Sequence, residues 1–465
     1  MFAYDVVAYE GQPIAQAHPD RLAVLGLLHG MSPAAIERAR VLELGCGDGA
    51  HLMPVAIMHP GCECTGIDLS ETAIERGRER ARKLGLTNLR LERGDILEIG
   101  PGFGEFDYII AHGVYSWVPE PVRDRLMAAA RECLAPQGIA FIDYNAYPGC
   151  HLRMMLRDMM LFQTDGIDDP DLKLQHTYAL LNFLAQSPRA SLAEEAKQAR
   201  ARTGWQLFHD DLGEVFHPVY FSQFMRHARA HGLQFLAEAQ YPTQQLFTLP
   251  AETADTIRMV SGDDIVLQQQ YLDFIELRRF RHTLLCREEI ALERPPDARR
   301  TKNLYAASMA ERVAQDEFRG PRGASMKTDL DYALAAIGYL SERRPAAVSF
   351  AELAAAAPVD EDTLAQFLLG TFAAGMLELH TGPSRFTIEP GERPRAFSLA
   401  RLEAAEGDQI ITSMRHHCIE LRNDTARRAL ILLDGTRDRK ALARELGGGV
   451  EANLAQLARL ALIEA

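Results

Sequence analysis

The 465-residue sequence lacks the features that mark several common classes of protein. It has no apolar run close to the 18 residues of a transmembrane helix, and its start has no cationic segment ahead of an apolar one. We therefore expect neither a membrane span nor a signal peptide, and predict a soluble, cytoplasmic protein. Only six of the 50 basic residues are lysines, and the 64 acidic residues give a net charge of −14. This charge argues against a protein whose main task is to grip nucleic-acid phosphates.

The seven cysteines are also few for a chain of this length. Cys62 and Cys64 lie two apart in a strand-like stretch, but no second pair of Cys or His follows at the spacing of a zinc site. Free buried thiols are the better interpretation. The sequence predicts no metal site.

Strand and helix patterns alternate from residue 20 to residue 145. Such alternation is typical of parallel βαβ units, so the fold class is α/β, with a doubly wound, Rossmann-like sheet. The predicted strands are Arg40–Leu44, Cys62–Asp68, Asn88–Glu92, Phe106–Ala111 and Gly138–Tyr144. The predicted helices between and around them are Asp20–His29, Ala50–Met58, Glu71–Leu84 and Pro121–Leu134.

The pattern changes after residue 150. Residues 151–204 predict a helical insertion, suited to a cap or a dimer contact, and residues 205–292 a segment that returns to complete the sheet. In that segment we expect a helix over Phe221–His231 and strands over Leu233–Ala239 and Phe280–Arg287. The proline pair Pro295-Pro296 predicts a boundary that few contacts cross.

The remainder predicts two small modules. Residues 300–390 indicate a winged-helix-like module, with helices 331–342, 349–356 and 360–376 and a hairpin wing over 377–388. Residues 391–465 indicate a helical module, with helices 424–433, 438–446 and 451–460. Residues 331–390 carry three basic and eight acidic side chains, and the third helix has no Lys or Arg. Protein contact is therefore favoured over DNA binding.

The most informative stretch is Val41–Gly49 (VLELGCGDG), where a strand meets a glycine-rich turn and a helix. Such a turn lets backbone approach a ligand closely. Gly45-x-Gly47-x-x-Ala50 also satisfies the dinucleotide fingerprint. Glu43 separates the two interpretations, because a carboxylate at the strand end repels a pyrophosphate and attracts a cation.

Two further acids stand where a nucleoside needs them. Asp68, at the end of the second strand, can take both ribose hydroxyls, and Asp95, after the third, can accept from an adenine amine. With Glu43 and the glycines, this set resembles class I S-adenosylmethionine-dependent methyltransferases. The resemblance implies S-adenosyl-L-methionine as cofactor, with S-adenosyl-L-homocysteine as product. It implies a cofactor site of Glu43, Gly45, Cys46, Gly47, Gly49, Asp68, Leu69, Asp95, Ile96 and His112.

Three more stretches resemble a narrower group: Tyr4–Leu22, Ala111–Pro119 (AHGVYSWVP) and Tyr144–Gly149 (YNAYPG). These are bacterial methyltransferases with a methyltransferase regulatory domain and often a winged-helix-like C-terminal region, similar to lysine methyltransferases of outer-membrane proteins. The resemblance makes residues 1–150 the cofactor-binding core and 205–292 the regulatory segment. Cys150 departs from the pattern, which has Trp after Pro-Gly.

Candidates for the acceptor site follow the fourth and fifth strands, because ligands of open α/β sheets bind beyond the carboxyl ends of strands. Aromatic faces favour a sulfonium or an ammonium, and an Asn carbonyl can orient an amine. His112 is either a proton acceptor or a backbone contact to the cofactor. Tyr9 and His18 either close over the site as a lid or begin a helix. The catalytic candidates are Tyr115, Trp117, Asn145, Tyr147, Tyr9 and His18.

The leading hypothesis is thus an S-adenosylmethionine-dependent methyltransferase acting on a protein, most plausibly on lysine amines. The alternative is a small-molecule N- or O-methyltransferase whose C-terminal modules serve as scaffold. A non-catalytic cofactor-binding regulator and an NAD oxidoreductase are two further hypotheses. The first is disfavoured by the acidic 331–390 segment and the second by Glu43. A protein or small-molecule substrate, no nucleic acid, no membrane insertion and a homodimer are the partner expectations.

Overall fold

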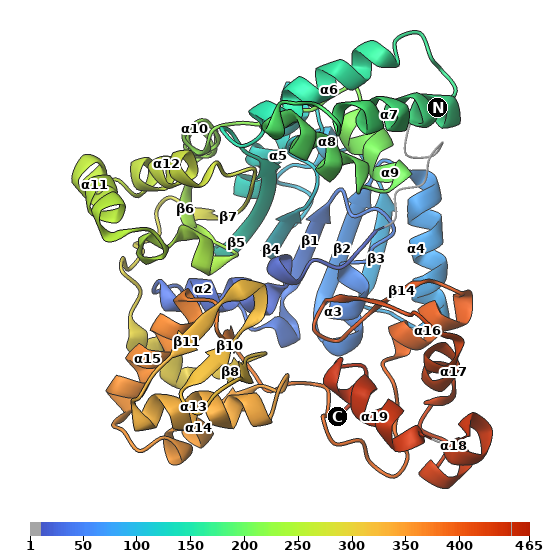
Figure 1. The fold of residues 1–465 in the computed structure, drawn as a ribbon, viewed down its shortest axis with the longest axis vertical. Coiled ribbons are helices and arrows are strands. Elements are labelled where there is room, and N and C mark those ends of the chain that lie inside the picture. Colours follow the sequence, from blue (N-terminus) through green and yellow to red (C-terminus); the bar gives the residue numbers. More distant parts are fainter. Residues whose placement is uncertain (1–10, 448) are drawn as a thin grey trace.

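The structure, a computed structural model, describes residues 11–447 and 449–465. Its centre is a seven-stranded sheet in the order β3-β2-β1-β4-β5-β7-β6 (Figure 1). All neighbours pair in parallel except β7, which runs antiparallel to both β5 and β6. The strands are β1 Arg40–Leu44, β2 Glu63–Asp68, β3 Leu89–Arg93, β4 Phe106–Ala111, β5 Leu134–Asn145, β6 Leu233–Glu238 and β7 Phe280–Arg287. The predicted doubly wound α/β class is confirmed.

Helices cover both faces of this sheet. One hydrophobic cluster joins the sheet to α2 (Pro19–Leu28), α3 (Leu52–Met58) and α4 (Glu71–Lys83). A second joins the other face to α5 (Glu120–Glu132) and α10 (Phe221–Ala230). The chain turns sharply between these elements. One such turn follows α4 at Gly85, whose φ is +70°. Because β1, β4 and β5 are parallel neighbours, their carboxyl ends lie at one edge of the sheet.

A helical insertion follows β5, as predicted. It consists of α6 (His151–Gln163), α7 (Pro170–Leu184) and α8 (Ala190–Arg200), which share a small core of their own. The insertion lies beyond the carboxyl ends of the strands, where a cap would be needed (Figure 1). A short turn α9 (Gly204–Gln206) and a π-helical turn (Leu207–Asp211) then lead the chain back towards the sheet.

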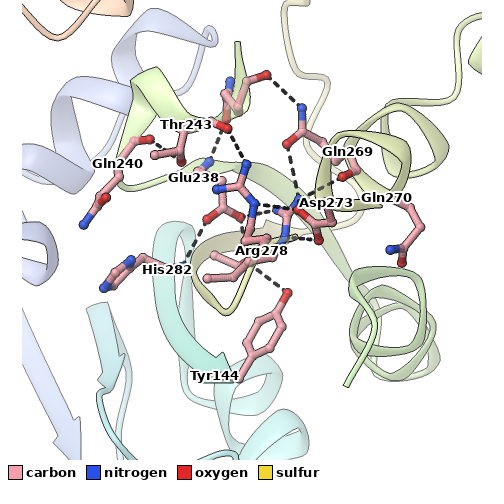
Figure 2. Close-up of polar contacts among 12 residues, drawn as sticks. Tyr144, Glu238, Gln240, Thr243, Gln269, Gln270, Asp273, Arg278 and His282 are labelled. Carbon is pink, nitrogen blue, oxygen red and sulfur yellow. Dashed lines mark hydrogen bonds and ion pairs between the residues drawn. The ribbon is translucent and has the colours of Figure 1, made fainter. Parts of the chain in front are cut away.

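The segment that completes the sheet contains two helices that were not predicted, α11 (Ala251–Ser261) and α12 (Ile265–Glu276), between β6 and β7. A buried ionic network fixes α12 to the strands. Arg281 donates to Asp273 and to Glu238, at 2.8 and 2.7 Å. Figure 2 shows Glu238 and Asp273 facing each other across this network, beside Arg278 and Tyr144. Because each of these carboxylates meets a guanidinium, the network can stay charged although it is buried.

The C-terminal part forms two modules. The first contains α13 (Asp331–Glu342), α14 (Phe350–Ala356), α15 (Glu361–Ala373), the sheet β12-β8-β13 (Val348–Ser349, Tyr305–Ala307, Glu378–His380) and the sheet β11-β10-β9 (Ser325–Lys327, Glu317–Arg319, Glu311–Arg312). The second contains α16 (Ser398–Glu406), β14 (Ile410–Thr412), β15 (Cys418–Glu420), α17 (Asp424–Leu432), α18 (Arg439–Leu446) and α19 (Val450–Arg459). The wing predicted over 377–388 is wrong. β13 pairs with β8, and Phe386 bridges to Glu464 near the chain end.

The predicted boundary at Pro295-Pro296 is also wrong, because many contacts cross it. Glu378 of β13 pairs with Arg21 of α2 and with Arg415. One continuous hydrophobic cluster contains Leu52 of α3 together with residues of the second module, among them Leu430 and Ile463. The modules therefore bury the surface of the catalytic core.

Within the two described ranges, none of the helices has the length and apolar character that crossing a bilayer requires. All seven cysteines are free, and all but Cys418 are buried, which confirms the interpretation as thiols.

Candidate functional site

The glycine-rich turn after β1 needs its glycines. Gly45, Gly47 and Gly49 have φ values of +77°, +54° and +76°, which other residues rarely adopt. A Cβ on Gly45 would lie 2.5 Å from Val114, and one on Gly49 2.9 Å from Leu91. A Cβ on Gly47, in contrast, would meet no described atom within 4 Å. The turn is packed on two sides and open at Gly47, so it leaves a cradle for a ligand there.

Three carboxylates surround this turn. Glu43 is 4% exposed, and its Oε2 has no hydrogen-bond partner among the described residues. One oxygen of Asp48, Oδ2, pairs with Arg76. The other, Oδ1, has no hydrogen-bond partner in the described chain. Asp68 accepts hydrogen bonds from the N–H groups of Gly47 and Ser70, both at 2.8 Å. Sequence reasoning missed Asp48, which sits between the glycines as an ordinary turn residue.

The charge of this group selects its ligand. Burial, and then repulsion from Asp68 and Asp48, raises the pKa of Glu43 well above its usual value. A cation placed beside Glu43 would relieve that repulsion, whereas a pyrophosphate would add to it. The site therefore fits the sulfonium and ammonium groups of S-adenosylmethionine and does not fit a dinucleotide.

Of the remaining predicted cofactor residues, Leu69 follows β2, Asp95 and Ile96 follow β3, and Cys46 lies in the turn after β1. Asp95 caps the 3-10 turn Ile96–Glu98 by accepting from the N–H of Leu97, at 2.9 Å. Ile96 and Cys46 are buried, whereas Leu69 is largely exposed. Their cofactor contacts, and those of Glu43 and Asp68, stay predictions.

His112 begins the loop after β4 and is held by β5. Its Nδ1 is in short contact with Oδ2 of Asp143, whose Oδ1 accepts from the N–H of Gly113. Burial opposes a charged ring, but Asp143 outweighs it and raises the pKa of His112. Asp143 itself is buried in the middle of an apolar strand. Sequence reasoning missed it, although an acid inside the stretch FIDYN is the signal that could have drawn notice.

The two aromatic candidates of that loop have different surroundings. Tyr115 is 3% exposed, its ring packs on Tyr144 and Phe224, and its hydroxyl lies 2.9 Å from Nδ1 of His227. Trp117 is half-buried and stacks on Phe216 of the regulatory segment, with ring centroids 4.7 Å apart. Tyr115 thus has the contacts of a residue buried in the core. Trp117 packs between the loop after β4 and the regulatory segment.

Asn145 ends β5 and meets a buried arginine. Its Oδ1, which was expected to orient an amine, accepts from Arg153 of α6 at 3.0 Å, and its Nδ2 has no partner among the described residues. Arg153 also pairs with Asp211 and lies over the Phe216 ring. The free group of Asn145 is therefore a donor. Its amide oxygen already accepts one hydrogen bond from Arg153, and the role of Asn145 in orienting an amine stays a prediction.

The other two catalytic candidates that the structure describes lie apart from this loop. Tyr147 stacks on His151, with ring centroids 4.2 Å apart, at the start of α6. His18 caps α2 by accepting from the N–H of Asp20, and packs edge-on against His416 of the last module. This is the helix-starting role that the sequence left open. Tyr9 lies outside the described residues.

A residue missed at the sequence level is Asp210, in the π-helical turn. Its carboxylate has no hydrogen bond among the described residues, and the guanidinium of Arg153 donates to its backbone carbonyl. Burial raises the pKa of Asp210 to about 6, with Arg153 opposing and Asp211 adding to the shift, and His112 is close enough to influence it. The regulatory segment thus contributes an acid with a pKa of about 6 that interacts electrostatically with His112.

Comparisons with known proteins agree with this architecture. Three family models match: "Methyltransferase domain" over residues 41–138, "Predicted methyltransferase regulatory domain" over 205–287, and "PKMT, C-terminal winged helix domain" over 392–460. The last match lies in the second C-terminal module rather than in 300–390, for which the sequence predicted the winged-helix character. The predicted domain limits other than the boundary at Pro295-Pro296 stay predictions.

Individual relatives extend the similarity to the full length. An uncharacterised protein of Rickettsia prowazekii is 36% identical over 241 residues, 50% of this chain and 96% of that protein. Another from the same organism is 38% identical over 298 residues, and the chain spans 54% of its length. Among solved structures, PKMT2 from Rickettsia typhi in complex with AdoHcy is 26% identical, with a TM-score of 0.86, covering 98% of this chain and 99% of that one.

Proposed function

Because this chain belongs to the class I S-adenosylmethionine-dependent methyltransferases with a regulatory domain and a PKMT-type winged helix domain, we propose that it methylates lysine amines of a protein. The observation that carries methyl transfer is the unpaired, buried carboxylate of Glu43 beside the open cradle at Gly47. When bound, S-adenosylmethionine supplies an activated methyl group on a cationic sulfur. Glu43, Gly47 and Asp68 are the residues that would hold it.

The chain's own residues must then prepare the acceptor. A lysine amine attacks only when it has lost its proton, so the site needs a group that can take one. Asp143 holds His112 by Nδ1, which leaves Nε2 of that ring for the proton. Asp210, which lacks a partner among the described residues, is the carboxylate that would meet a lysine ammonium. We assign His112 and Asp210 these roles as part of the proposal.

The surrounding walls favour alignment and exclusion of water. Trp117 and Phe216 stack on each other and form an aromatic boundary between the loop after β4 and the regulatory segment. Aromatic faces attract cations, and positioning of this kind supplies several kcal/mol of rate enhancement. We propose that the insertion 151–204 caps this space. The C-terminal modules favour a bulky, protein acceptor, since they enlarge the surface around the core.

The experiment is transfer of labelled methyl from S-adenosylmethionine by the full chain to a bacterial protein extract that includes the outer-membrane fraction, with a metabolite extract in parallel. We expect label in protein that yields methyl-lysine on acid hydrolysis, and much less with Asp68→Ala at a cofactor concentration near the parent's dissociation constant. Label confined to metabolites would contradict the protein acceptor and support the small-molecule alternative. No transfer to either extract, in a chain that binds S-adenosylhomocysteine, would contradict the proposal of an active enzyme. Nucleic-acid exclusion, a homodimer and the cytoplasm stay predictions.

A further inference from the structure

Two histidines share one face of α10, away from the cofactor cradle. His227 and His231 lie four residues apart, at and just after the last turn of α10, and their ring centroids are 5.4 Å apart. Side chains at this spacing lie above one another on a helix. The same spacing is how a helix presents two imidazoles to one zinc ion.

A carboxylate from another helix completes the group. Oδ1 of Asp124, in α5, lies 3.2 Å from Nε2 of His227 and 2.8 Å from Nε2 of His231. The three ligand atoms all lie within 4.8 Å of one another. With metal–ligand bonds of about 2.0–2.1 Å, a tetrahedral ion places its ligand atoms roughly 3.3 Å apart. The two distances to Asp124 are close to this value, whereas the two imidazole nitrogens, which lie within 4.8 Å of each other, set how far the side chains must move to accept an ion.

The contact between His227 and Tyr115 orients the His227 ring for metal binding. Nδ1 of His227 lies 2.9 Å from the buried hydroxyl of Tyr115, so its Nε2 faces Asp124. A hydrogen bond at the far nitrogen is the usual support of a metal-binding histidine. The Asp124 side chain is 62% exposed, which leaves room for a water ligand in a fourth position.

We propose that Asp124, His227 and His231 form a binding site for a divalent transition-metal ion such as Zn²⁺. The site ties α5 of the methyltransferase domain to α10 of the regulatory domain. Through the contact between His227 and Tyr115, a bound ion would also stiffen the loop that carries His112 and Trp117. The proposal does not rest on the nature of the methyl acceptor.

The test is calorimetric titration of Zn²⁺ alone into the untagged, chelator-treated full chain carrying Cys418→Ser. That background removes the one exposed thiol. We expect one ion per chain and a raised midpoint of thermal unfolding, with binding weakened at least tenfold in His231→Gln. His217→Gln, at an exposed histidine of the same segment, is the matched control and should bind like the parent. Titration with Co²⁺ should give the visible absorption of a four-coordinate ion without a thiolate band.

The result is clear in each direction. Equal Zn²⁺ binding by parent, His231→Gln and His217→Gln would overturn the site, as would no binding by the parent. If His231→Gln is the only variant that unfolds more easily without metal, Asp124→Asn is used as the test variant in its place. The Asp124 side chain is exposed, so its replacement leaves the helix packing intact. Retained one-to-one binding in Asp124→Asn and His227→Gln would likewise overturn the proposal.

Discussion

Two buried groups of carboxylates beside the same sheet differ in whether their oxygens are paired with cationic side chains. Glu238 and Asp273 both pair with Arg281, and Asp273 also pairs with Arg278 (Figure 2). Around the glycine-rich turn, Glu43 and one oxygen of Asp48 have no partner among the described residues. The carboxylates of the first group are paired without a ligand, whereas the second group leaves carboxylate oxygens unpaired. We expect these unpaired oxygens to mark the functional end of the sheet.

The largest effect, on the free energy of unfolding, is expected from breaking the network around Arg281. Arg281→Met would leave Glu238 and Asp273 buried with one guanidinium fewer, and we expect unfolding in urea to become easier by about 3–5 kcal/mol. Arg258→Met, at an exposed arginine paired with Asp255, is the control and should change stability by less than about 0.5 kcal/mol. A loss below about 1 kcal/mol in Arg281→Met would mean that the network contributes little to stability.

A smaller effect, on cofactor binding rather than on stability, is expected at the carboxylates around the glycine-rich turn. Asp68→Ala removes the carboxylate predicted to hold the ribose, at a cost of about 1.5–3 kcal/mol, or roughly ten- to a hundred-fold in affinity for S-adenosylhomocysteine. Calorimetry on the variant and the parent measures it. Asp107→Ala, near the amino end of β4 and two strands away from β2, is a control outside the cradle and should bind like the parent. Unchanged affinity in a folded Asp68→Ala protein would refute the assignment.

The smallest effect concerns a third buried group, at the interface with the C-terminal modules. His51 accepts from the N–H of Ile14, its Nε2 is unpartnered in the described chain, and burial lowers its pKa to about 3. A lowered folded-state pKa means that its stabilising contribution is present above pH 6.5 and is lost as the pH falls below 6.5. From pH 7 to pH 5.5 this costs about 1.2 kcal/mol.

Urea unfolding at pH 7 and pH 5.5 tests this. His51→Asn keeps an acceptor near the Nδ1 position but cannot be charged, so its loss of stability on acidification should be smaller than the parent's by about 1 kcal/mol. A variant of the exposed His151 is the matched control. The same acid response in parent and His51→Asn would show that His51 is not the group that takes up the proton.

The sequence predicts the parts of this molecule that depend on local pattern. Strands β4 and β7 were predicted with the limits that the structure has, β4 from an apolar run and β7 from the short apolar stretch Leu284–Cys286 within it. The turn at Gly45–Gly49 was found because its glycines stand at fixed spacing between a strand and a helix.

The parts that were missed depend on contacts between distant residues. Asp143 and Asp210 matter through His112 and Arg153, which no local pattern links to them. The boundary at Pro295-Pro296 was wrong for the same reason, since Glu378 reaches back to Arg21 across more than 350 residues. Helices α11 and α12 were missed because the segment was interpreted only by its strands.

The central claim is that the unpaired carboxylates around the glycine-rich turn select a nucleoside ligand with a cationic amino-acid part over a dinucleotide. Its most direct test is a pair of calorimetric titrations of the full chain, one with S-adenosylhomocysteine and one with NAD under the same conditions. We predict saturable one-to-one binding of S-adenosylhomocysteine and no binding of NAD at concentrations that saturate the first. Binding of NAD as tight as or tighter than that of S-adenosylhomocysteine would contradict the account.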